Sequence, residues 1–142
     1  MGSKEQQYSL PSVLIDTPIW LDYFRKEEGI FREVNDLMDA GRVCCSDLGA
    51  AELLLTAQNR QEMKVFQDFT RIFPILKEPN GAWVQAAKLA FKWRQKGREC
   101  SLRDCYIVLL AKANGALLYT TNKEILQAGK RVGLKFFPKG NL

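Results

Sequence analysis

The sequence predicts an α/β fold in which a parallel sheet of about five short strands is flanked by helices on both faces. Three observations lead to this fold. Short β-rich segments alternate with segments of helical periodicity along the chain, and such alternation is typical of parallel sheets covered on both faces. The 142 residues are the usual size of one domain. The composition, 46% hydrophobic and 26% charged, is that of a globular protein.

Five segments have the length and the residue types of strands. One of them contains Pro74, and a proline is tolerated in a sheet mainly at an edge, so we expect this strand to lie outermost. The expected strands are residues 12–16, 42–46, 71–76, 117–121 and 135–137.

The segments between them carry helical patterns with recognisable ends. Thr17 and Pro18 form a helix start, with Thr17 as N-cap and Pro18 at the first helical position. Gly41 is a C-terminal stop. Residues 102–114 are apolar on most sides, which predicts a buried helix. The expected helices are residues 18–24, 30–40, 48–58, 61–70, 81–96 and 102–114, with a short one from residue 123.

The apolar runs and the chain ends bear on organisation. We expect residues 1–11 to be an N-terminal tail, whose first three residues resemble a cloning remnant, and residues 12–142 to be one domain. The longest apolar run, residues 106–111, ends at Lys112, well short of the roughly 18 residues of a membrane span. We therefore expect no membrane association and no signal sequence.

The cysteine and histidine counts restrict the chemistry. The four cysteines form no C-x-x-C pair, so we expect neither a zinc site nor a disulfide framework, and a reducing, cytoplasmic compartment. The chain has no histidine, which excludes Ser-His and Cys-His nucleophile mechanisms. The net charge of +5 favours an anionic partner only modestly.

Carboxylates stand where an α/β fold forms its sites, just beyond the predicted strand ends. Asp16 ends the first strand, and Asp104 lies in the first turn of the buried helix. Glu52 lies among apolar residues, where a charge is costly unless it is paired or bound to a cation. Asn122 follows the fourth strand.

Each of these residues also has a purely structural interpretation. Asp16 and Asn122 are common turn and capping residues. Glu52 suits the exposed face of an amphipathic helix, and Ser101 with Asp104 has the spacing of a capping box. Carboxylates that converge on one pocket repel each other unless a hard cation such as Mg²⁺ or Mn²⁺ neutralises them. Such an ion activates water and stabilises phosphoryl charge, so the pattern favours phosphodiester hydrolysis.

In order and spacing, four motifs resemble the PIN-domain ribonucleases, and among them the VapC-type toxins of type II toxin–antitoxin systems. The motifs are VLIDT at 13–17, AAELL at 50–54, DCYIVLLA at 104–111 and LYTTN at 118–122. The resemblance covers residues 12–137 and implies a three-layer α/β fold. It also implies an endoribonuclease that depends on Mg²⁺ or Mn²⁺, pairs as a homodimer and is neutralised by a cognate antitoxin at residues 18–40.

The resemblance also assigns roles to individual residues. Asp16, Glu52 and Asp104 match the three core acids of the family, so that Asp16 and Asp104 anchor the metal while Glu52 binds it or orients the attacking water. Thr17 matches the hydroxyl residue after the first acid, and Thr120 matches a residue that positions metal or water. Where many members carry a fourth acid this chain has Asn122, a weaker ligand, which puts a second metal in doubt.

Two basic residues near these motifs, Arg103 and Lys123, are candidates for contact with the RNA backbone. The main alternative is a catalytically degenerate PIN domain that acts as an RNA-binding or protein-interaction module, and Asn122 is its best support. A phospho-acceptor receiver domain would need an acidic pair before Asp16, where the chain has Val13, Leu14 and Ile15. Neither glycine-rich nucleotide-binding motif is present.

Overall fold

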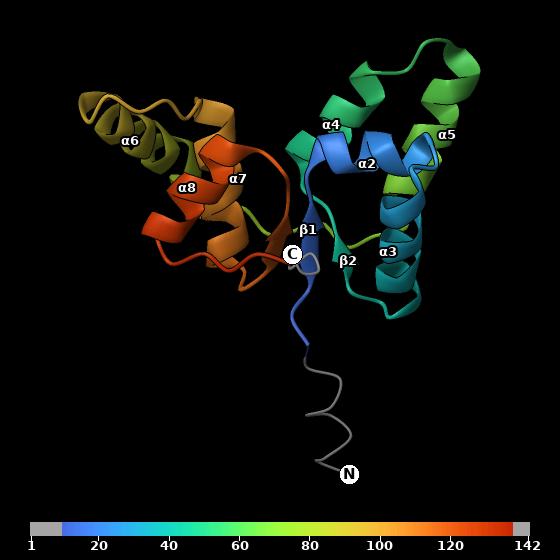
Figure 1. The fold of residues 1–142 in the computed structure, drawn as a ribbon. Helices are drawn as coiled ribbons and strands as arrows, with labels where there is room; N and C mark the ends of the chain where they lie inside the picture. The colour runs from blue at the N-terminus through green and yellow to red at the C-terminus, as the bar shows by residue number, and fades with distance from the viewer. Residues whose placement is uncertain (1–9, 138–142) are drawn as a thin grey trace.

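The computed structural model describes residues 10–137 and places a parallel sheet between two groups of helices (Figure 1). The central strand β1 (Val13–Ile15) pairs with β2 (Val43–Cys44) on one side and with β3 (Leu117–Tyr119) on the other. The predicted α/β class with a parallel sheet is confirmed. Most of the predicted tail at 1–11, and the last residues of the predicted domain at 12–142, lie outside the described residues.

The predicted strand count was too high. The segments predicted as strands at 71–76 and 135–137 each form a single parallel bridge, Cys45 to Ile75 and Leu118 to Phe136. Each exchanges one pair of hydrogen bonds with its neighbour; at the first, the Cys45 amide donates to the Pro74 carbonyl at 2.9 Å. Pro74 has no amide proton with which to extend the ladder. The sheet therefore has three strands and two edge segments.

Seven helices cover the two faces of the sheet within the described part of the chain, and their ends differ by three residues or fewer from those predicted. One group follows β1 and β2: α2 (Thr17–Phe24), α3 (Glu28–Asp39), α4 (Asp47–Leu55) and α5 (Arg60–Thr70). The other lies on the opposite side (Figure 1): α6 (Ala82–Gln95), α7 (Leu102–Ala113) and α8 (Lys123–Arg131). The predicted burial of the helix at 102–114 is confirmed, since α7 buries six of its residues.

Each group of helices packs its own hydrophobic core against the sheet. Trp20 is 5% exposed and meets Phe69 edge-on at 5.2 Å, which ties α2 to α5. Trp93 is 6% exposed in the other core. On the same helix Trp83 is 39% exposed and stacks on Tyr106 at 3.8 Å. Packing therefore accounts for these three tryptophans.

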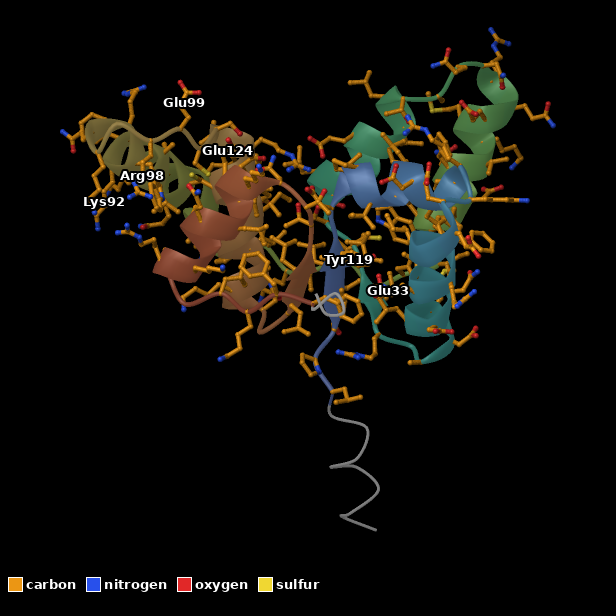
Figure 2. All side chains as sticks on the ribbon, in the orientation of Figure 1. Glu33, Lys92, Arg98, Glu99, Tyr119 and Glu124 are labelled. Carbon is orange, nitrogen blue, oxygen red and sulfur yellow. The ribbon has the colours of Figure 1, made fainter. Side chains whose placement is uncertain are left out.

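A polar contact also ties α3 to the sheet. Figure 2 shows Tyr119 of β3 beside Glu33 of α3, and the tyrosine hydroxyl donates a hydrogen bond to the Glu33 carboxylate. Burial and the nearby carboxylate raise the pKa of Tyr119, so this hydroxyl keeps its proton. In residues 10–137, no helix has both the length and the apolar character needed to cross a bilayer.

Candidate active site

The site is built around Asp16, which follows β1 directly and is 3% exposed. The Asp16 carboxylate caps α2, because its Oδ1 accepts a hydrogen bond from the Thr17 amide at 3.0 Å. The prediction that Thr17 is the N-cap was therefore wrong: Thr17 is the first helical residue, and the side chain of the preceding residue, Asp16, is the acceptor. The second oxygen of Asp16 accepts a hydrogen bond from the Thr120 hydroxyl at 2.8 Å.

Glu52 reaches the same place from α4. The Thr17 hydroxyl donates to Glu52 Oε1 at 2.8 Å, so the residue after the first acid orients the second acid. Asp104 approaches from the first turn of α7, where its amide donates to the Ser101 hydroxyl at 3.1 Å. Helix capping and placement in the site are thus compatible for Asp104.

Asn122 completes the set at the start of α8. Its Oδ1 accepts a hydrogen bond from the Ile125 amide at 3.0 Å, and its own amide donates to the Thr120 hydroxyl at 3.1 Å. The side-chain oxygen is therefore engaged in capping α8. An open pocket of about 310 Å³ is lined by Asp16, Thr17, Pro18, Glu52, Leu55, Thr56, Arg103, Asp104 and Asn122.

Arg103 lies in the middle of the three acids. Its Nε donates to Glu52 Oε2 at 2.8 Å and its Nη2 to Glu52 Oε1 at 2.7 Å, a bidentate pair. The same Nη2 donates to Asp16 Oδ1 at 2.7 Å, and Nη1 donates to Asp104 Oδ1 at 3.0 Å. The Arg103 side chain is only 25% exposed. One guanidinium thus joins a carboxylate that directly follows β1 with carboxylates from α4 and α7.

These contacts set the charge state of two groups. Burial alone would raise the pKa of Glu52, but hydrogen bonds from Arg103 and Thr17 and the charge of Arg103 outweigh it, so the pKa is lowered. Burial would lower the pKa of Arg103, but the hydrogen bond to Glu52 and the charge and hydrogen bonds of the other acids raise it. Glu52 is therefore held as a carboxylate and Arg103 as a cation.

Comparison with known proteins identifies the family. The model of the PIN domain matches residues 13–131, most of the chain. The chain belongs to the PIN domain family. The matched region contains all four motifs and every residue that lines the pocket.

Individual PIN-domain relatives agree with this assignment. Ribonuclease VapC1 of Methanocaldococcus jannaschii is 24% identical over 127 residues, which are 89% of this chain and 88% of that protein. The crystal structure of FitAcB from Neisseria gonorrhoeae matches with a TM-score of 0.71 and 20% identity, over 92% of this chain and 99% of that one. VapBC-1 from nontypeable Haemophilus influenzae matches with a TM-score of 0.68 and 22% identity, over 88% and 96%. The predicted resemblance to VapC-type proteins is confirmed.

The donor chemistry of this PIN domain suits a hard divalent cation. Carboxylate, amide and hydroxyl oxygens line the pocket, and these are the ligands that Mg²⁺ and Mn²⁺ prefer. The present arrangement is different: in the described part of the chain, no three acidic, histidine or cysteine side chains are grouped so as to hold one ion. Arg103 lies between the carboxylates instead.

Most, but not all, of the residues predicted from the sequence lie at the pocket. Residues Asp16, Thr17, Glu52, Asp104 and Asn122 line the pocket, with Thr120 behind Asp16. Lys123 is exposed at the start of α8 and does not line the pocket. The neighbouring Glu124 is exposed too (Figure 2). Arg103 was predicted to face RNA, but its guanidinium points into the acids. Sequence reasoning missed this contact, because its partners Asp16 and Glu52 are 87 and 51 residues away.

Proposed function

We propose that this PIN domain is a VapC-type endoribonuclease that depends on Mg²⁺ or Mn²⁺ and hydrolyses phosphodiester bonds in RNA. The observation that carries the proposal is the meeting of three acids from separate elements, Asp16, Glu52 and Asp104, in one open pocket. The family and the name of the curated relative, a ribonuclease, support the same activity.

The roles of the residues follow from their contacts. Asp16 and Asp104 would hold the divalent ion, and Asp16 is kept in one orientation by Thr120 and the Thr17 amide. Glu52 would bind the ion or orient the attacking water, with its rotation limited by the Thr17 hydroxyl. When bound, the ion supplies an acidified water and positive charge opposite the phosphate.

The chain would serve as the toxin of a toxin–antitoxin pair, neutralised by a cognate antitoxin. Several structural relatives are complexes of this kind, including the VapBC-1 structure. Leu55 is 85% exposed and lines the pocket beside Glu52, and a protein segment that buried this leucine would also obstruct the acids. The antitoxin contact at residues 18–40 and the homodimer rest on the family resemblance. Sedimentation equilibrium tests the homodimer, and the loss of antitoxin binding on substitution of exposed residues within 18–40 tests the contact.

The alternative is a degenerate PIN domain that binds RNA or protein without cleavage. Two features favour it: Asn122 replaces a fourth acid, and Arg103 occupies four of the six carboxylate oxygens that an ion could use. Incubating the purified protein with a mixed RNA pool in Mg²⁺, in Mn²⁺ and in chelator separates the two functions. Cleavage that requires the ion supports the nuclease. RNA binding without cleavage in either metal establishes the degenerate domain.

A further inference from the structure

Arg103 takes up four of the six carboxylate oxygens through which the acids would bind a metal ion. Its four shortest hydrogen bonds end on Asp16 Oδ1, both oxygens of Glu52 and Asp104 Oδ1. The guanidinium is a permanent cation with donors in a fixed fork. Chemically it stands in for a bound cation, since its single positive charge pairs with the same three carboxylates at 2.7 to 3.0 Å.

The contact is more than a mobile surface ion pair. Exposed pairs hold two flexible side chains in water and are weak. Here the Arg103 side chain is 25% exposed and the Asp16 side chain only 1%, and the pair with Glu52 is bidentate. Charge-assisted bonds of this geometry are the strong class. The three carboxylates also belong to separate elements, so the guanidinium stabilises the arrangement of β1, α4 and α7 around it.

We infer that Arg103 is a built-in competitor for the divalent cation: it occupies the acidic site of the metal-free protein, and an ion binds only when the Arg103 side chain swings out. This inference rests on the proposed metal site. A guanidinium and a divalent ion at contact distance from Asp16 Oδ1 and the Glu52 carboxylate would repel each other strongly, because both are cations. The wild type therefore binds metal more weakly, because part of the binding free energy is used to break the Arg103 contacts.

The first test is calorimetric titration with Mn²⁺ of metal-free wild type, Arg103→Gln and Arg60→Gln. Arg60 is exposed at the start of α5, so its variant makes the same change in net charge away from the site. We expect Arg103→Gln to bind Mn²⁺ at least tenfold more tightly than wild type, or about 1.4 kcal/mol. Arg60→Gln should match wild type. Equal affinity in all three proteins would overturn the competition and leave the metal site intact.

The second test needs no variant that must fold. In ¹⁵N-labelled wild type, the Arg103 Nε–H donates to Glu52, so it should give a protected NMR signal in the metal-free protein. Saturation with Mg²⁺ should shift this signal and remove its protection. A signal that stays unchanged while Mg²⁺ binds would overturn the inference. If neither metal binds to any of the proteins, both the metal site and the competition fall.

Discussion

Replacing Arg103 by glutamine in the metal-free protein should lower the free energy of unfolding substantially. The variant loses ion pairs to Asp16, Glu52 and Asp104 and leaves three carboxylates facing one another. Removing one partner of a fully buried pair costs about 3–5 kcal/mol. The guanidinium is 25% exposed, and water screens part of this charge, so we expect about 2–4 kcal/mol.

The assay is urea unfolding in chelator, followed by tryptophan fluorescence, with Arg60→Gln as the control for net charge. The control should stay within about 0.5 kcal/mol of wild type, as surface changes do. Saturating Mn²⁺ should then stabilise Arg103→Gln more than wild type, since an ion that binds only the folded state stabilises it by mass action. If Arg103→Gln unfolds at the same urea concentration as the control, the guanidinium does not hold the acids together and the reasoning fails.

Three further predictions concern other features. Because the pKa of Glu52 is lowered in the folded protein, its carboxylate stabilises the fold at pH values above its ordinary pKa of 4.5. This stabilisation is lost as the pH falls through the pKa of the folded state. Glu52→Gln should therefore flatten the stability curve below about pH 4.5 in urea titrations at several pH values; a curve parallel to wild type would contradict this. Gly129→Ala should destabilise the protein by about 1–3 kcal/mol in thermal melts, because a Cβ there meets Phe136 Cζ at 2.5 Å. The control Gly29→Ala, whose Cβ would have no atom within 4 Å, should melt like wild type, and equal melting temperatures of the two variants would reject the packing argument. Asn122→Asp keeps a cap for α8 and adds a carboxylate to the pocket. Titration with Mn²⁺ should therefore show tighter binding, while the free energy of unfolding stays unchanged; an unchanged affinity would place residue 122 outside the metal site.

Local features made the helices predictable from the sequence. Helix ends depend on residues close in the chain: Ser101 caps α7, Asn122 caps α8, and Gly41 follows α3 with a φ of +68° that glycine adopts without strain. The outer strands were overpredicted because a strand depends on partners far along the chain. Ile75 finds only Cys45, and Pro74 supplies no amide to extend the pairing.

The candidate site was predictable only in part. The acids could be named because each has a local signal, the end of a strand or an apolar setting, and the family resemblance set them side by side. The contact of Arg103 could not be predicted, since tertiary packing alone brings it to Asp16 and Glu52. Its predicted contact with RNA stays a prediction, and it requires the guanidinium to leave the acids first.

RNA cleavage by site variants tests the central claim most directly. Wild type, Asp16→Asn, Asp104→Asn and Asp39→Asn should be compared in Mg²⁺ and in Mn²⁺ with one RNA pool, after circular dichroism confirms that each is folded. Asp39 is an exposed acid at the end of α3, directly before the turn into β2 and away from the strand ends that carry the site. We predict that wild type and Asp39→Asn cleave in a metal-dependent manner, while Asp16→Asn and Asp104→Asn do not. Folded Asp16→Asn and Asp104→Asn proteins that cleave as fast as Asp39→Asn would contradict the account, because the acids would then have no part in the chemistry.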